Sequence, residues 1–260
     1  MKRKTLVTYL SIVIFLTGCL IPGQQSPKID PEHELLLQII TAFENRAYES
    51  SIEMCQQFLN QYPKSTYKDM VLMRMGESFE GLLKQEYQKL VAEGMEEAKV
   101  RTIFLERYGH YNCWEVKEGR LVYNKEIYRR LLKENPNSNY ADEASYNLIP
   151  WEKEYHEDPH RIEKEVAYLE EILKKYPTTS LRPKILFQMG YRFHLLYELY
   201  NFTNDPAKRD KRKAQESFRK AEYLYKLCLS LPHGSEYSKK ALHYLEVLRK
   251  GSRIYLNPSS

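Results

Sequence analysis

The fold prediction begins with a pattern that occurs at Phe58-Leu59-Asn60-Gln61-Tyr62-Pro63 and again at Ile172-Leu173-Lys174-Lys175-Tyr176-Pro177. Two apolar residues are followed by two variable ones, then by tyrosine and proline. Upstream of each copy the apolar residues follow helical spacing, as in Ile52, Cys55 and Leu59. Proline just past a helix end is a stop signal, so each copy predicts the end of a helix.

The residues after the two prolines also repeat. Met75-Gly76 and Met189-Gly190 each place a glycine thirteen residues after the proline (76 − 63 and 190 − 177). A glycine inside a helix costs about 1 kcal/mol relative to alanine, and close approach of a neighbouring helix would compensate for it. Degenerate copies of the helix-end pattern finish at Tyr108-Gly109, Asn135-Pro136 and Leu231-Pro232.

These residues resemble the tetratricopeptide repeat. The second-helix pattern of that family is matched in register by Tyr48, Ser51, Ile52, Cys55, Phe58, Leu59 and Pro63. The Pro/Gly marks are 46, 27, 41 and 55 residues apart (109 − 63, 136 − 109, 177 − 136 and 232 − 177). A regular array repeats about every 34 residues. The resemblance implies an all-α fold, a right-handed α-α superhelix of irregular repeats over residues 31–250.

Helix boundaries follow from caps and apolar spacing. Asp30-Pro31 predicts the start of the first helix, and Asp158-Pro159 and Asp205-Pro206 repeat that arrangement. A short β-hairpin, with an extended loop as the alternative, is predicted near residues 110–123, where apolar residues alternate on both sides of Lys117-Glu118-Gly119. Further helices are expected near 48–61, 67–84, 86–107, 124–134, 139–156, 159–175, 181–201, 206–230 and 235–250.

The N-terminus has the features of a lipoprotein signal. Lys2, Arg3 and Lys4 precede about 13 uncharged residues, fewer than the ~20 that a spanning helix needs. Leu16-Thr17-Gly18-Cys19 resembles the lipobox of bacterial lipoproteins, which implies a signal peptide over 1–18 and lipidation of Cys19. Pro22, Gly23 and Pro27 make residues 19–30 a tether; residues 251–260 form a tail.

Lipobox, tether and Tyr-Pro repeats together resemble the BamD-type lipoproteins of outer-membrane assembly and, second, Tol-Pal-type periplasmic repeat proteins. Leu20 follows the lipidated cysteine, where aspartate would retain a lipoprotein at the inner membrane. The resemblance therefore implies the outer membrane, facing the periplasm, or the outer face of the plasma membrane in a bacterium with one membrane. It implies envelope proteins as partners, with a cell-wall or division role as the alternative to barrel assembly.

Charge excludes one class of function. The chain has 260 residues and a formal net charge of +5. Residues 1–18 contribute three basic residues and no acid, which leaves 37 − 35 = +2 for the remainder. Such a balance does not suit a body that neutralises nucleic-acid phosphates, so no nucleic-acid partner is expected. With 29% charged and 42% hydrophobic residues the chain is neither disordered nor a multi-span membrane protein.

His156-Glu157-x-x-His160 matches the zinc-peptidase motif and gives the competing hypothesis, a metal-dependent hydrolase or enzyme subunit. That motif requires one continuous helix, whereas Pro159 lies inside it and disfavours a helix by ~3 kcal/mol or more. No third ligand is marked. We therefore expect a non-enzymatic protein with no cofactor and no metal site.

Two further features have open interpretations. Cys55, Cys113 and Cys228 are an odd number of thiols beyond Cys19, and Cys55 and Cys228 fall at positions expected to be buried. The basic residues of 208–213 open a predicted helix, either as a solvated helix start or as a contact for anionic lipid headgroups.

In the resembled family, the first helix of each pair lines the concave surface. Setting the two Met-Gly pairs on the family's Leu-Gly positions predicts a partner-binding surface made by Met70, Met73, Glu77, Glu80, Lys184, Phe187, Tyr191 and His194. The mixture of Met, aromatic and charged side chains suits a protein partner better than a small polar substrate. The sequence therefore favours a lipid-anchored envelope scaffold.

Overall fold

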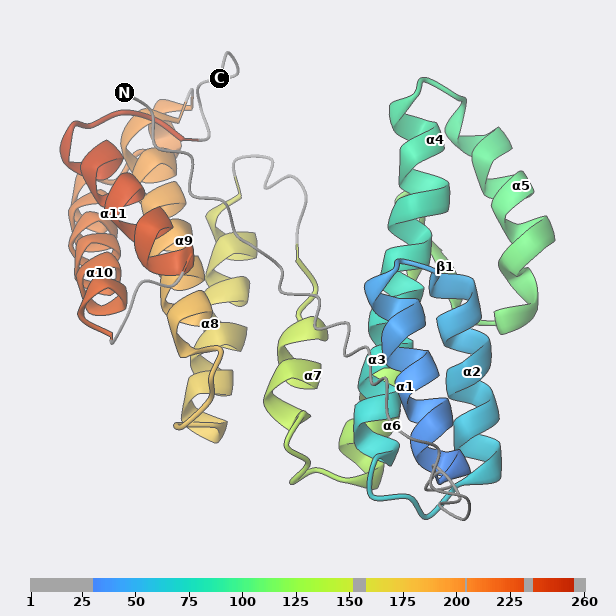
Figure 1. Cartoon of the computed structure of the whole chain (residues 1–260). Coiled ribbons are helices and arrows are strands. Elements are labelled where there is room, and N and C mark those ends of the chain that lie inside the picture. Colours follow the sequence, from blue (N-terminus) through green and yellow to red (C-terminus); the bar gives the residue numbers. More distant parts are fainter. Residues whose placement is uncertain (1–29, 152–157, 204, 232–235, 255–260) are drawn as a thin grey trace, which may run out of the picture.

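The structure is a computed structural model that describes residues 30–151, 158–203, 205–231 and 236–254. Antiparallel helices follow one another along the chain (Figure 1). The α-helices are α1 (Pro31–Glu44), α2 (Tyr48–Gln61), α3 (Lys68–Leu82), α4 (Lys89–Ala92), α5 (Glu97–Tyr108), α6 (Glu126–Glu134), α7 (Ala141–Asn147), α8 (Pro159–Lys175), α9 (Arg182–Phe202), α10 (Lys211–Ser230) and α11 (Glu236–Arg249). The strands are β1 (Trp114–Lys117) and β2 (Arg120–Tyr123).

Three of the predicted helix ends are followed by turns that share one hydrogen-bond pattern. Ser65, Ser138 and Thr179 each lie two residues after the proline of the pattern. Their hydroxyls accept the backbone N–H two residues further on, at 2.9, 3.2 and 3.1 Å. Side chains of this kind stabilise turns by bonding their own backbone. The three copies therefore reverse the chain in the same way between α2 and α3, α6 and α7, and α8 and α9.

Gly76 and Gly190, the two glycines that lie thirteen residues after their prolines, are located where helices touch, as predicted. A Cβ added at Gly76 would lie under 3.0 Å from the ring of Tyr128 on α6. At Gly190 it would meet Tyr225 of α10 at 2.8 Å. The absence of a side chain therefore admits a tyrosine ring at the same place in each repeat.

A buried polar contact also repeats between equivalent positions. Ser51 of α2 and Ser78 of α3 are joined by a hydroxyl–hydroxyl hydrogen bond of 2.9 Å. The two prolines are 177 − 63 = 114 residues apart. The same offset relates Ser51 to Glu165 (165 − 51) and Ser78 to Arg192 (192 − 78). Glu165 and Arg192 form an ion pair of 2.8 Å between α8 and α9. Different chemistry thus joins the same two helix faces in the two repeats.

Two groups of apolar core residues lie on either side of α7. One extends from Leu35 to Ala144 and fills the N-terminal half, α1 to α6. The C-terminal half, α8 to α11, is filled by two smaller clusters that begin at Tyr146 and Ile162. The division falls inside α7, which lies between the halves (Figure 1). The predicted repeat domain therefore contains two cores that meet at one short helix.

Three predicted helices are shorter than expected. The helix expected over 206–230 is α10 from Lys211, because Asp205-Pro206 starts only a 3-10 turn and Asp210 caps α10. The segment expected as one helix over 86–107 is a π-helix over Leu83–Gln88, then α4 and α5, because Gly94 adopts φ 88° and reverses the chain. The helix expected over 139–156 ends at Asn147, since Pro150 follows and cannot donate a backbone hydrogen bond. Residues 152–157 lie outside the described part of the chain.

The hairpin prediction is confirmed. β1 and β2 pair in antiparallel fashion with Trp114 opposite Tyr123, and Gly119 occupies the turn at φ 79°. Trp114 packs edge-on to Phe79 of α3, with ring centroids 5.7 Å apart. Aromatic packing therefore holds the insertion against the N-terminal core.

The all-α, helical-repeat prediction is confirmed by this architecture. Within the described residues, no helix combines the length and the apolar character that crossing a membrane requires.

Candidate partner-binding surface

Charged side chains from both halves lie within electrostatic range of one another beside α7. The pKa of Lys184 on α9 is lowered by burial, and Glu143, Glu80 and Glu77 oppose that shift. Since these carboxylates come from α7 and α3, the structure brings the two predicted groups of site residues together. We call this cluster the charged seam; its members are Arg74, Glu77, Glu80, Lys125, Glu143 and Lys184.

Partial burial is the main influence on the acidic side chains of the charged seam. Burial raises the pKa of Glu77, and the ion pair with Arg74 at 2.5 Å lowers it in part. The pKa of Glu80 is raised for the same reason, with Lys125 as the main opposing charge. The side chain of Glu77 is still 20% exposed. These charges are therefore partly desolvated yet within reach of a partner.

Lys125 attaches the N-terminal half to the end of α7. It has left-handed backbone geometry (φ 62°) at the start of α6. Its ammonium group donates to the carbonyl oxygens of Asn147 at 2.5 Å and Ile149 at 3.1 Å. A cation at a helix C-terminus is favoured by the helix dipole. Lys125 therefore fixes the junction on which the charged seam is built.

An aromatic surface continues from the charged seam along α9 and α11. The ammonium of Lys184 lies 4.1 Å from the ring centroid of Tyr146. Further along, Tyr191 packs edge-on to Tyr244 with centroids 5.3 Å apart. Tyr191 and Tyr244 are half-buried. Tyrosines with one apolar side packed and a polar tip in water are typical of binding surfaces.

The structure corrects three of the predicted partner contacts. Met73 is 1% exposed, Phe187 is 6% exposed and His194 is fully buried. Met70, Glu77, Glu80, Lys184 and Tyr191 remain half-exposed. Each repeat buries the position three residues before its glycine, because that side of the helix faces the core. Met73, Phe187 and His194 therefore belong to the core rather than to a partner surface.

The exposed faces of α3 and α9 also include two residues that are not among the predicted partner contacts. Arg74 and Gln188 each lie two residues before the repeat glycine, and both are half-exposed. Arg74 also covers the ring of Phe43, at 4.9 Å from its centroid. Their shared place in the repeat was visible in the sequence as an equal offset. Neither the family pattern nor hydropathy gave them weight.

The zinc-peptidase motif lies partly outside the described residues, which include neither His156 nor Glu157. Its last member, His160, is exposed in the first turn of α8. Asp158 caps that helix by accepting the N–H of His160 at 3.0 Å, so α8 begins at Pro159 as predicted. In the described ranges, no three His, Cys, Asp or Glu side chains are grouped so that they could hold a metal ion.

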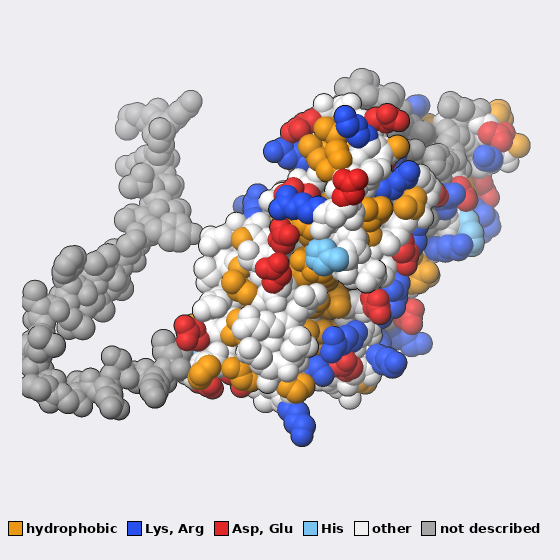
Figure 2. Space-filling model, turned by 90° about the vertical axis from the view of Figure 1, so that its right-hand side faces the viewer, with side chains coloured by type: hydrophobic (Ala, Val, Ile, Leu, Met, Phe, Trp, Pro, Cys, Tyr) orange, Lys and Arg blue, Asp and Glu red, His pale blue; other side chains and the backbone are white. Residues whose placement is uncertain are grey.

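The remaining predicted residues are placed as follows. Cys55, Cys113 and Cys228 are buried and unpaired, and burial raises the pKa of Cys55 and Cys113 to about 12. Cys19 lies outside the described residues. On the face shown in Figure 2, acidic, basic and hydrophobic side chains are interspersed. Comparison of the sequence with models of known families and with curated proteins finds no match.

Proposed function

We propose that this chain is a non-enzymatic scaffold of the bacterial envelope, anchored by lipid at Cys19 and binding protein partners. Outer-membrane protein assembly is the proposed process, and the periplasmic side of the outer membrane the proposed location. The lipobox-like Leu16-Thr17-Gly18-Cys19 supports the anchor. Stacked helix pairs support the scaffold, because such arrays create extended binding surfaces.

The observation that carries the proposal is the charged seam together with Tyr191 and Tyr244. Half-buried acids and lysines on three helices lie near half-buried tyrosines on α9 and α11. Partly desolvated charges interact more strongly with an incoming group than fully solvated ones. Aromatic residues provide contact area at low cost in conformational entropy. This combination suits a protein segment with both charged and apolar side chains.

Anchoring is tested by replacing the proposed lipid acceptor. The Cys19→Ser variant removes the thiol that would take the diacylglycerol group. We expect labelled palmitate to be incorporated into the native chain and not into the variant. Incorporation into Cys19→Ser would contradict the proposed anchor.

Partner binding is tested by a crosslinking pull-down from membranes. The double variant Glu77→Ala/Tyr191→Ala alters both halves of the surface, and circular dichroism checks that the fold survives. The matched control is Glu171→Ala/Tyr223→Ala, which removes the same side chains from exposed sites on α8 and α10. We expect the first variant to lose at least tenfold in recovery of its main partner and the control to lose none. Equal recovery by both would contradict the proposed surface.

A further inference from the structure

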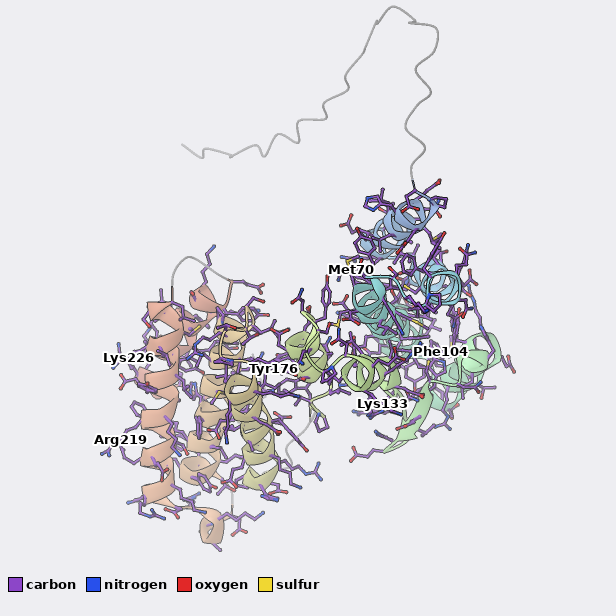
Figure 3. All side chains as sticks on the ribbon, turned by 90° about the horizontal axis from the view of Figure 1, so that it is seen from below. Met70, Phe104, Lys133, Tyr176, Arg219 and Lys226 are labelled. Atoms are coloured by element: carbon purple, nitrogen blue, oxygen red, sulfur yellow. The ribbon has the colours of Figure 1, made fainter. Side chains whose placement is uncertain are left out.

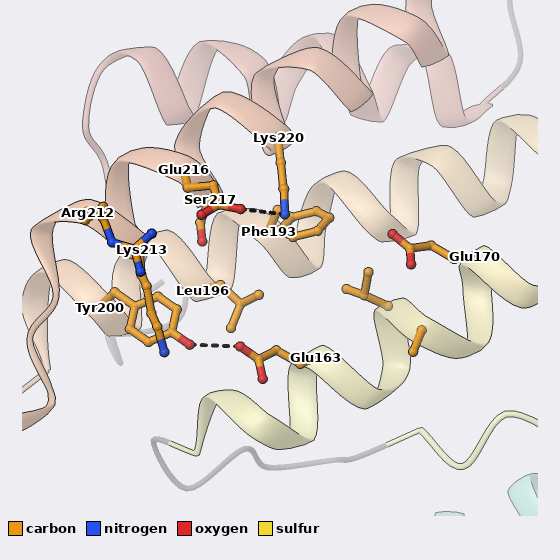
Figure 4. A pocket seen from close by; sticks show the side chains of 12 residues that line it. Glu163, Glu170, Phe193, Leu196, Tyr200, Arg212, Lys213, Glu216, Ser217 and Lys220 are labelled. Carbon is orange, nitrogen blue, oxygen red and sulfur yellow. Dashed lines mark hydrogen bonds and ion pairs between the residues drawn. The ribbon is translucent and has the colours of Figure 1, made fainter.

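A second concave region lies on the other side of the C-terminal half. It is a cavity of about 370 Å³ between α8 and α10, with α9 as its floor (Figure 4). Phe193, Leu196 and Tyr200 supply the floor. Phe193 is nine residues from Lys184, which is two and a half helical turns. The cavity, here named the α8–α10 groove, therefore opens on the side of α9 opposite to the charged seam.

The two walls of the α8–α10 groove carry opposite charge. Glu163 and Glu170 line the α8 wall. The α10 wall has three basic side chains, Arg212, Lys213 and Lys220, and one acidic side chain, Glu216. The net charge is therefore negative along the α8 wall and positive along the α10 wall.

Some of these charges are already engaged and others are available. Glu163 accepts a hydrogen bond of 2.9 Å from the Tyr200 hydroxyl, and Lys220 pairs with Glu216 at 2.8 Å (Figure 4). Among the described residues, Glu170 and Arg212 form no ion pair with each other or with another side chain. One acidic and one basic group are therefore open to a ligand, on opposite walls.

The packing of α8 and α10 on either side of α9 favours a helix as the occupant of the α8–α10 groove. α8 and α10 both pack on α9. Packed helices lie 8–10 Å apart, so two helices that flank a third leave a valley into which the apolar face of another helix fits. Val166 and Ala167 continue the apolar lining up the α8 wall.

We propose that the α8–α10 groove binds an amphipathic helix of a partner protein. Its apolar stripe lies on Phe193 and Ala167, its acidic edge faces Arg212 and Lys213, and its basic edge faces Glu170. The basic start of α10 then serves protein binding. Because the groove and the charged seam use opposite sides of α9, one chain can hold two partners at once. This inference does not depend on the lipid anchor or on the charged seam.

The test uses the full chain and two synthetic helical peptides of identical composition. Both have the same apolar stripe. In the first, all glutamates lie along one edge of the stripe and all lysines along the other; in the second, the two charges alternate on both edges. Fluorescence anisotropy measures their affinities. We expect the first peptide to bind at least tenfold more tightly than the second, with a preference that falls as salt rises.

Variants locate the binding. Ala167→Trp fills the groove from an exposed position, whereas Gln215→Trp places the same indole on α10 outside the lining. Glu170→Lys reverses a wall charge, whereas Glu171→Lys makes the same change one position along α8 and outside the groove. We expect each groove variant to weaken the first peptide at least tenfold and each control to leave its affinity unchanged. Equal affinity for the two peptides, binding of neither, or binding unaffected by Ala167→Trp would overturn the proposal.

Discussion

At the scale of single residues, Gly76 and Gly190 show how packing determines the residue type at equivalent positions of two repeats. Helix propensity alone favours alanine at both sites by about 1 kcal/mol. The tyrosine rings of Tyr128 and Tyr225 occupy the space where a Cβ would lie. Packing therefore decides the residue at these positions, and the equal spacing of the two glycines from their prolines made this predictable.

Gly76→Ala and Gly190→Ala should each destabilise the fold by about 1–3 kcal/mol, because overpacking outweighs the gain in helix propensity. Gly109→Ala is the matched control. Its φ of −62° is helical and an added Cβ would meet only Leu105, at 3.9 Å, so this change should be neutral or stabilising. Chemical denaturation of the three variants measures the effect. A raised denaturation midpoint for Gly76→Ala and Gly190→Ala would show that the tyrosine rings move to make room for the added methyl group.

His194 predicts a dependence of stability on pH. Burial lowers its pKa from 6.5 to about 4. Below pH 6.5 the unfolded chain takes up a proton that the folded chain does not, so stability falls as the pH drops from 6.5 toward 4. From pH 7 to pH 5 the loss from this group should be about 2 kcal/mol.

The comparison is the denaturation free energy at pH 7 and pH 5 for the native chain and for His194→Leu. The variant should lose about 2 kcal/mol less over this interval. Identical pH dependence in the two proteins would mean that His194 takes up its proton in the folded state.

At the scale of elements, most of the helices could be predicted from caps and spacing. The bounds of α2 and α8 coincide with the predictions, since proline after each helix and Asp158-Pro159 before α8 mark the ends. The break between α4 and α5 was missed because its helical spacing continues across Gly94. The exposure of the proposed partner residues could be predicted only in part. The family register placed Lys184, Glu77 and Glu80 at half-exposed positions, whereas neighbouring helices decide the burial of Met73 and His194.

The repeated polar contact should differ in strength between its two copies. Arg192→Ala removes the guanidinium that pairs with the 1% exposed Glu165, and we expect a loss of about 2–3 kcal/mol. Ser78→Ala removes a neutral hydrogen bond from Ser51 and should cost about 1–2 kcal/mol. Urea denaturation measures both.

The control for this prediction is Glu165→Met/Arg192→Met, which replaces both charges by apolar side chains. It should lose less stability than Arg192→Ala, because it leaves no buried carboxylate that has lost its guanidinium partner. A double variant as unstable as Arg192→Ala would assign the loss to packing, for example of Arg192 on Trp151 at 4.6 Å.

At the scale of the whole molecule, two apolar cores are joined by α7 and by polar contacts. Lys125 binds the end of α7, and Thr179 donates a hydrogen bond of 2.5 Å to Asp142. The charged seam lies on one side of the C-terminal half and the α8–α10 groove on the other. Arg219 and Lys226 point outward from α10 at its far edge (Figure 3). A body with several separate surfaces suits a scaffold.

The central claim is that the charged seam and its neighbouring tyrosines contact a protein partner. Its most direct test is a photo-crosslinking amino acid at Met70 or Gln188, one on each half of the surface, compared with the same group at the exposed Gln57 on α2. In native membranes, we predict that both surface positions crosslink to one and the same protein, that Gln57 does not, and that Glu77→Ala/Tyr191→Ala abolishes the adduct. Adducts that form equally at Gln57, or that persist in the double variant, would contradict the account.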